Sequence, residues 1–295
     1  MTTQPLADPF ADVSLIPGLM RLLDYPELQR PKALARWIER RLEQGLSLFD
    51  HADIYGNGEC ERLFGAALAA APALRDRVRL ITKADIVPAG QDDSLWGVKH
   101  YRACARYLTD ALERSLDRLQ VSQVDTFLIH RPDPLMEADD VARALERLVR
   151  DGKVRHIGVS NFLPEQWRWL QRHTSLPLVC NQAELSLAHT APLLDGRHEA
   201  MQQDGLRWLA WSPLGGGQLA DRLPKDLLAR AREETGLCLT GLATAWIRRL
   251  PGAPVPVLGS LRDERIDAAL AGCHVRLSRT LWFRLLEASR GQPVA

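Results

Sequence analysis

The sequence lacks the features that mark several classes of protein. Its 38 Lys and Arg face 37 Asp and Glu, a formal net charge of +1, so no excess of positive charge indicates a broad nucleic-acid surface. No apolar run approaches the roughly 18 residues of a membrane span, and the N-terminus has no signal-peptide pattern. We therefore expect a cytoplasmic protein that binds neither nucleic acid nor membrane and needs no obligate protein partner.

Disulfide and metal signatures are also missing. The five cysteines are an odd number without a C-x-x-C pair, a pattern typical of reduced thiols in a cytosolic chain of this length. Cys180 lies in an apolar run, so we expect it to be a small core residue. Because the sequence has no H-E-x-x-H motif and no Cys/His cluster, we predict no metal site.

What the sequence does contain is an alternation of two kinds of segment. Short apolar runs rich in β-branched residues predict buried strands at Leu46–Asp50, Val78–Thr82, Val124–Ile129, Val154–Val159, Leu178–Asn181, Leu206–Trp211 and Val255–Leu258. Amphipathic stretches predict helices at Pro31–Gln44, Glu59–Ala70, Cys104–Leu119, Ala138–Arg150, Pro164–His173, Thr240–Leu250 and Ser278–Ala288.

Such an alternation predicts a parallel sheet with right-handed crossovers. With a first strand at Ser14–Arg21 the chain has about eight strands, which favours a closed (β/α)8 TIM barrel over an open doubly wound sheet. No G-x-G-x-x-G follows the first strand, as a Rossmann fold would require. Because we find no linker, we expect residues 1–295 to form a single domain.

The active site of such a barrel lies at the carboxyl ends of its strands. Polar or ionisable residues follow nearly every predicted strand: Asp50, Lys83, His130, Ser160 with Asn161, Gln182, Trp211 with Ser212, and Gly259 with Ser260. We expect these side chains to gather at one mouth of the barrel.

Seven motifs, each at a predicted strand end, carry a resemblance to a known family. They are F-D-H-A-D-I-Y-G from Phe49, I-T-K-A from Ile81, L-I-H-R-P-D from Leu128, G-K-V-R-H-I-G-V-S-N-F from Gly152, C-N-Q-A-E from Cys180, W-S-P-L-G-G-G from Trp211 and G-S-L-R-D-E-R-I from Gly259. In this order they resemble the aldo-keto reductase superfamily, most closely its short bacterial YdhF-like oxidoreductase branch. The resemblance implies NADPH-dependent reduction of aldehydes and ketones to alcohols.

The resemblance also implies a catalytic tetrad of Asp50, Tyr55, Lys83 and His130. Reduction of a carbonyl needs a proton on oxygen, and a free phenol with a pKa of about 10 is a weak acid at neutral pH. We expect Lys83 beside the Tyr55 oxygen to ease proton release, with Asp50 pairing Lys83. His130, neutral beside Lys83, would position the carbonyl. Without the resemblance, the spacing of Asp50 and Tyr55 would favour a loop cap and a half-buried tyrosine over a catalytic pair.

The cofactor residues follow from the same resemblance. Ser160, Asn161 and Gln182 would bind the nicotinamide carboxamide, and Trp211 would stack on the ring. The pyrophosphate would lie against Ser212, Leu214, Gly215, Gly216 and Gly217, and the 2′-phosphate against Gly259, Ser260 and Arg265.

Two departures from the family pattern concern specificity. Gly259 stands where many members have a Lys, and Ala268 and Ala269 where many have a Glu and an Asn, so we expect NADPH with NADH also possible. The segment after His130 is short, which predicts an open pocket for small or aromatic carbonyl compounds. Trp96 would either form one wall of this pocket or pack on the barrel rim.

Two rival functions remain open at this point. A nicotinamide-binding redox sensor or scaffold would bind NADPH and turn over slowly. A lyase or aldolase would use Lys83 as a Schiff base, but the cofactor motifs argue against this reading.

Overall fold

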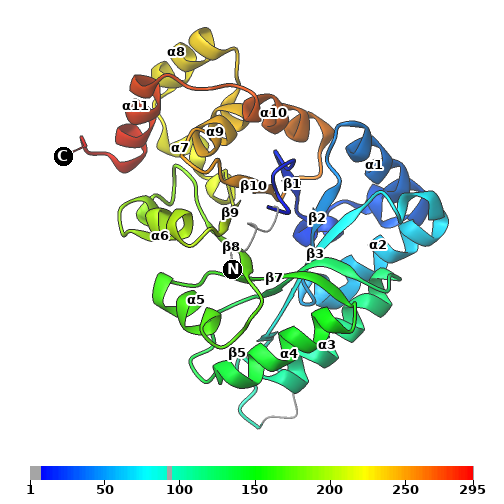
Figure 1. Cartoon of the computed structure of the whole chain (residues 1–295). Helices are drawn as coiled ribbons and strands as arrows, with labels where there is room; N and C mark the ends of the chain where they lie inside the picture. Colours follow the sequence, from blue (N-terminus) through cyan, green and yellow to red (C-terminus); the bar gives the residue numbers. More distant parts are fainter. Residues whose placement is uncertain (1–7, 92–94, 295) are drawn as a thin grey trace.

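Eight parallel strands form a nearly closed barrel in the computed structural model, which describes residues 8–91 and 95–294 (Figure 1). They are β1 (Ile16–Pro17), β2 (Leu48–Asp50), β3 (Arg79–Ala84), β6 (Val124–Ile129), β7 (Val154–Ser160), β8 (Leu178–Glu184), β9 (Arg207–Trp211) and β10 (Val255–Leu258). The sheet order is β1-β10-β9-β8-β7-β6-β3-β2, and a parallel bridge between Gly18 and Asp50 joins its two edges. The predicted (β/α)8 TIM barrel is confirmed.

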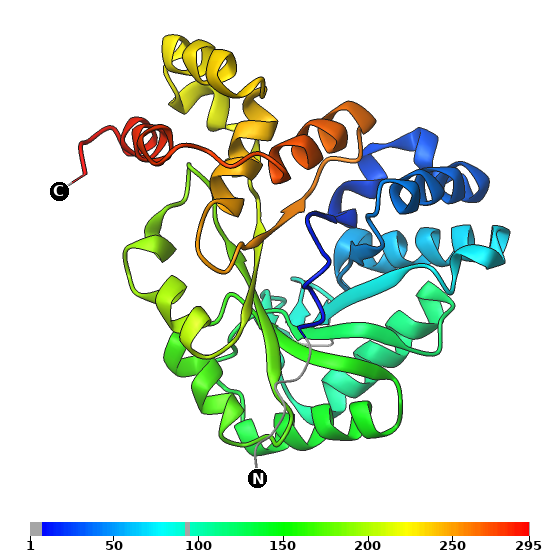
Figure 2. The same ribbon diagram turned by 45° about the horizontal axis from the view of Figure 1, so that its top comes forward.

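Helices surround this barrel on its outside (Figures 1 and 2). They are α1 (Pro31–Glu43), α2 (Glu59–Ala70), α3 (Ala105–Leu119), α4 (Ala138–Arg150), α5 (Pro164–Gln171), α6 (Arg197–Gln203), α7 (Leu219–Arg222), α8 (Lys225–Thr235), α9 (Leu239–Arg248), α10 (Asp263–Cys273) and α11 (Arg279–Arg290). In α4, Val141, Leu145 and Leu148 share one face and are buried, as helical spacing dictates. Among the described residues, none of these helices is long and apolar enough to cross a membrane.

The first strand is much shorter than the sequence predicts. Instead of Ser14–Arg21, only Ile16–Pro17 pairs with β10, and a 3-10 helix (η1, Leu19–Asp24) follows. Pro17 has no N–H to donate to the sheet ladder, so a long strand is disfavoured here. A further antiparallel pair, β4 (Ile86–Val87) with β5 (His100–Tyr101), was not predicted.

The interior of the barrel is filled by apolar side chains. Phe10, Val13, Ile16, Leu48, Ile81, Leu128, Cys180, Leu209, Val255 and Val257 form one buried cluster. Cys180 is fully buried there, as predicted, and all five cysteines are free. A packed interior leaves room for a site only at the two ends of the barrel.

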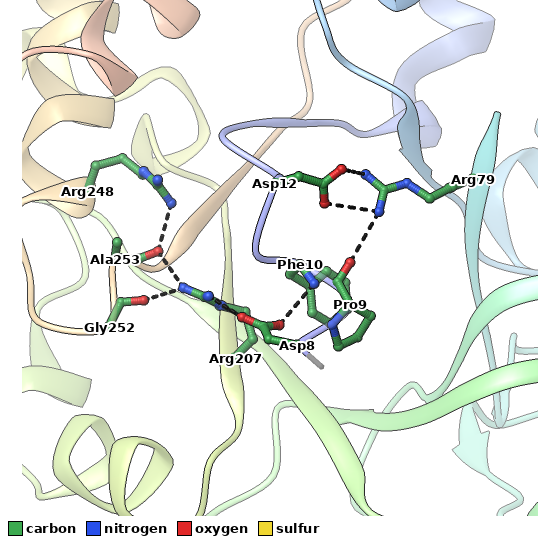
Figure 3. Close-up of polar contacts among 9 residues, drawn as sticks. All are labelled: Asp8, Pro9, Phe10, Asp12, Arg79, Arg207, Arg248, Gly252 and Ala253. Atoms are coloured by element: carbon green, nitrogen blue, oxygen red, sulfur yellow. Dashed lines mark hydrogen bonds and ion pairs between the residues drawn. The ribbon is translucent and has the colours of Figure 1, made fainter. Parts of the chain in front are cut away.

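The amino-terminal end of the barrel, its floor, is closed by residues 8–13 (Figure 3). Phe10 inserts into the interior with 1% of its surface exposed. Arg79, at the start of β3, pairs with Asp12 at 2.9 Å and donates to the Pro9 carbonyl at 3.2 Å. Arg207, at the start of β9, pairs with Asp8. Two ion pairs from strands on different sides of the barrel thus fasten one apolar plug.

Candidate active site

A cavity of about 330 Å³ opens at the carboxyl ends of the strands. Of the predicted site residues it is lined by Asp50, Tyr55, His130, Ser160, Asn161, Gln182, Trp211, Ser212, Leu214, Gly216, Gly217, Gly259, Ser260 and Arg265. Lys83 lies beneath the cavity, bonded to Asp50, and Gly215 stands between two lining residues. The structure therefore brings the predicted residues together at one mouth.

Asp50 and Lys83 form a buried ion pair, with Lys83 Nζ 2.6 Å from Asp50 Oδ1. The ammonium also donates to the His51 carbonyl at 2.7 Å, and Gln182 Nε2 donates to the same Asp50 oxygen at 2.7 Å. Burial lowers the pKa of Lys83, while the charge of Asp50 opposes this shift. The pair, formed between β2 and β3, is thus held by the His51 carbonyl just after β2 and by Gln182 on β8.

Tyr55 begins a 3-10 turn (η3, Tyr55–Gly58) in the loop that follows β2. Lys83 Nζ lies 5.2 Å from the centre of its ring, and the His130 ring meets it edge-on at 6.2 Å between centroids. Burial, reinforced by Asp50, raises the pKa of Tyr55 well above its usual value. The phenol is therefore protonated at neutral pH. The predicted tuning role of Lys83 would require its Nζ to contact the Tyr55 phenol oxygen. Among the described contacts, Nζ instead donates to Asp50 Oδ1 and to the His51 carbonyl.

His130 directly follows β6 and is buried. Its backbone N–H donates to the Ala84 carbonyl at 3.0 Å. Burial, with the charges of Lys83, Arg131 and Lys99, lowers the pKa of His130 well below its usual value. The imidazole is accordingly neutral, in agreement with the prediction.

Ser160, Asn161, Gln182 and Trp211 are joined by hydrogen bonds. The Trp211 indole N–H donates to Asn161 Oδ1 at 3.0 Å, and Asn161 Nδ2 donates to Ser160 Oγ at 2.8 Å and to the His130 carbonyl at 3.2 Å. Ser160 Oγ donates to the Gln182 carbonyl at 2.8 Å. Trp211 thus offers more than a stacking face, because its N–H fixes the orientation of Asn161.

The glycine loop after β9 is a tight 3-10 turn (η6, Gly215–Gly217). Gly215 has a φ of 56°, and an added Cβ would lie 2.5 Å from the Ala188 Cβ, so only glycine fits. Gly216 N–H donates to Ser212 Oγ at 3.1 Å. The N–H groups of Gly215 and Gly217 donate to the Ser212 and Leu214 carbonyls. The amides expected to face a pyrophosphate therefore stabilise the turn itself.

Several residues of this region were missed by sequence reasoning. Glu61, fully buried, accepts from Thr82 Oγ at 2.6 Å and from Arg118 at 3.4 Å. Burial and the neighbouring Glu61 raise the pKa of Asp53 to about 7. The sequence signal that could have indicated these buried polar residues is the position of Asp53 between Asp50 and Tyr55 in the motif D-H-A-D-I-Y.

The cavity wall also carries cations and apolar residues that the sequence did not single out. Arg21, Lys99 and Arg131 line it, together with Gly18, Met20, Ile54, Ile86, Pro213, Val257 and Leu258. Trp96, offered as a possible wall, has 86% of its surface exposed. The loop before β5 contributes Lys99 instead. Across residues 8–91 and 95–294, no group of three or more His, Cys, Asp or Glu could hold a metal ion.

Comparisons with known proteins agree with this geometry. The model of the aldo/keto reductase family matches residues 14–289. Oxidoreductase YdhF of Escherichia coli (strain K12) is 40% identical over 282 residues, covering 94% of this chain and 93% of the relative. A 6-dehydroglucose reductase of Agrobacterium fabrum is 39% identical over 294 residues, covering 98% of both.

Solved structures are similar over nearly the whole chain. An aldo/keto reductase from Klebsiella pneumoniae in complex with NADP and acetate superposes with a TM-score of 0.78 at 25% identity, over 96% of this chain and 93% of that one. A second one, from the same organism with NADPH, gives 0.77 at 26% identity, over 96% and 92%.

This chain belongs to the aldo/keto reductase family and is an NAD(P)H-dependent oxidoreductase. The resemblance seen in the sequence, including that to YdhF, is confirmed.

Proposed function

We propose that this protein reduces aldehydes and ketones to alcohols with NADPH, and that Tyr55 supplies the proton. The observation that carries the proposal is the continuity of one cavity from Tyr55 and His130 at one end to Ser260 and Arg265 at the other. The Klebsiella relatives, crystallised with NADP and NADPH, support the choice of cofactor.

The residues at the far end of the cavity fit an adenosine 2′-phosphate. Ser260 Oγ is buried and has no hydrogen-bond partner among the described residues. Arg265 lines the same end and can bind a phosphate with its planar fork. We propose that these two residues hold the 2′-phosphate, that the turn at Gly215–Gly217 packs against the pyrophosphate, and that Trp211 stacks on the nicotinamide. When bound, NADPH supplies the hydride.

At the reacting end each side chain has a separate task. Tyr55 carries its proton at neutral pH and can donate it to the carbonyl oxygen. Neutral His130, facing the same cavity, can donate a hydrogen bond that orients the carbonyl. Asp50, Lys83 and Gln182 form the buried network below them. Ser160 and Asn161, which are hydrogen-bonded to each other, would bind the nicotinamide carboxamide, and Trp211 orients Asn161 through its indole N–H.

Cofactor choice, domain organisation and cellular location complete the proposed function. Gly259 has no side chain to reach the phosphate, although an added Cβ there would meet nothing within 4 Å. We therefore keep NADH as a second possible cofactor. We also propose that residues 1–295 form one domain, since α9 packs both on α10 and on the barrel strand β10. We propose a cytoplasmic enzyme acting on small carbonyl compounds, without nucleic acid or an obligate partner.

The test is NADPH oxidation across a panel of aldehydes, ketones and quinones, with wild type and Tyr55→Phe. Loss of the proton donor should lower kcat by at least about 10²-fold, the low end for general acid catalysis, while NADPH binding changes little. A variant with near-normal turnover would remove Tyr55 from the proposal. Tight NADPH binding without turnover on any member of the panel would favour the redox sensor.

A further inference from the structure

The catalytic mouth carries positive charge that the reduction of a neutral carbonyl does not require. Arg21, Lys99 and Arg131, here called the basic lip, line the cavity that holds Tyr55 and His130. The carboxylate on that wall, Asp50, is already paired with Lys83. None of the three lip residues forms an ion pair with a carboxylate in the described part of the chain.

We propose that the natural substrates are carbonyl compounds bearing an oxyanion, a carboxylate or a phosphate, which Arg131 and Lys99 bind. This inference rests on the proposed function and names the class of substrate for the same site. A guanidinium forms paired, charge-assisted hydrogen bonds with either oxyanion, and the exposed ammonium of Lys99 adds a second cation.

Arg131 is well placed for this role because its backbone is fixed. Its N–H donates to Asp85 Oδ2 at 3.0 Å. The residue before it, His130, is held on both sides, by the Ala84 carbonyl at 3.0 Å and by Asn161 Nδ2 at 3.2 Å. Asp85 has a φ of 126°, a strained conformation for a residue other than glycine. A strained backbone conformation persists only where surrounding contacts hold it in place, so the contacts around Asp85 also fix the backbone of Arg131.

The lip acts electrostatically on the reacting groups. Arg131 and Lys99 both contribute to lowering the pKa of His130, and Arg131 opposes the rise in the pKa of Tyr55. Because the basic lip lines the same cavity as His130 and Tyr55, an anionic group bound to these cations would share that cavity with the reacting carbonyl. Positive potential in a cavity also raises the local concentration of anionic substrates.

The experiment compares aldehydes that differ only in charge. We would measure kcat/KM with NADPH for 4-carboxybenzaldehyde against 4-carbamoylbenzaldehyde, and for succinic semialdehyde against its amide. Wild type should prefer the acid in at least one pair by about tenfold, the scale of one hydrogen bond to a charged group. Added salt should reduce this preference, because the lip is partly exposed to solvent.

Arg131→Gln and Lys99→Gln should each lower the ratio of acid to amide toward one, mainly by raising KM for the acid. The ratio cancels any effect of Arg131 on Tyr55 that is common to both aldehydes. Arg172→Gln is the matched control: this exposed arginine ends α5, at the opposite end of the barrel, and the ratio should not change. Lys99→Gln, at an exposed site, keeps the test decisive if Arg131→Gln folds poorly.

The outcomes separate the two proposals. Equal efficiency on acid and amide in both pairs, with good turnover, would overturn the basic lip and leave the proposed function intact. A full preference for the acid retained in both lip variants would also overturn the assignment. Failure to reduce any aldehyde in the panel, neutral or charged, would instead overturn the proposed function itself.

Discussion

The two ends of the barrel are built on the same strands and differ in how their charges are satisfied. At the floor, Arg79 and Arg207 each meet an aspartate from residues 8–13, and Phe10 fills the space between them. At the mouth, within the described part of the chain, Arg131 has no carboxylate partner and Ser260 Oγ has no hydrogen-bond partner.

This difference indicates that the floor contributes mainly to the stability of the fold and the mouth mainly to ligand binding. A satisfied, apolar floor lowers the free energy of the fold, whereas unsatisfied groups at the mouth are a cost that a ligand can relieve. Substitutions at one end of the barrel, with stability and cofactor binding both measured, test this division.

Phe10→Ala should have the largest effect, and only on stability. Truncating a buried phenylalanine costs about 3–5 kcal/mol, and Phe10 is 1% exposed inside the barrel. Denaturant unfolding would measure the loss. Phe283→Ala, at a side chain 37% exposed, is the control and should lose less. The folded Phe10→Ala enzyme should keep its kcat; a large drop in kcat would mean that the floor also shapes the mouth.

Asp53→Asn should change the pH dependence of stability. Folding raises the pKa of Asp53 from 3.8 to about 7, chiefly through burial. Between these values the folded chain holds a proton that the unfolded chain has lost, so stability falls as the pH rises from about 4 to about 7. The asparagine variant should show a flatter profile and greater stability at pH 8. The free energy of unfolding, measured in urea at several pH values, gives this profile. The same slope of stability against pH in wild type and variant would contradict the raised pKa of Asp53.

Arg265→Ala should weaken binding at the mouth without affecting the floor. Loss of a hydrogen bond to a charged group costs roughly 1.5–3 kcal/mol, so NADPH should bind about tenfold more weakly or worse. NADH, which has no 2′-phosphate, should bind almost as before. Binding titrations of NADPH and NADH to wild type and variant would measure both affinities. An equal loss of affinity for the two cofactors would mean that Arg265 has a structural role instead.

Trp211→Phe should have the smallest effect. The variant keeps an aromatic face and removes the N–H that donates to Asn161 Oδ1 at 3.0 Å. One hydrogen bond contributes about 1 kcal/mol, so kcat/KM should fall roughly fivefold. A double-mutant cycle with Asn161→Ala would isolate the pair, and strictly additive losses would show that the two residues are not coupled.

Most of the barrel could be predicted from the sequence because its signals are local. Strands such as β6 and β10 are short apolar runs, and α4 shows a clear helical face, so their observed bounds equal the predicted ones. The β4–β5 pair was missed because two-residue strands show no periodicity. The first strand was overestimated because the apolar residues around Pro17 resemble a strand, although proline cannot donate to the ladder.

The candidate site was predicted residue by residue but not in its internal bonding. The positions of Asp50, Tyr55 and His130 follow from strand ends, and the cavity contains them. That Trp211 would bond Asn161 across 50 positions could not be predicted, because such contacts depend on side-chain orientation. Arg131 follows His130 directly, yet nothing in the sequence distinguishes a paired arginine from an unpaired one.

The plug at the floor also has a consequence for synthesis on the ribosome. Asp8 is made 199 positions before its partner Arg207. At about 5–20 residues per second, the two are separated by roughly 10–40 s of translation. During this interval Phe10 has no finished barrel to enter, so residues 8–13 are made early but are among the last to be fixed in place. In a nascent chain stalled before β9, protease should therefore cleave residues 8–13, and release from the stall should protect them.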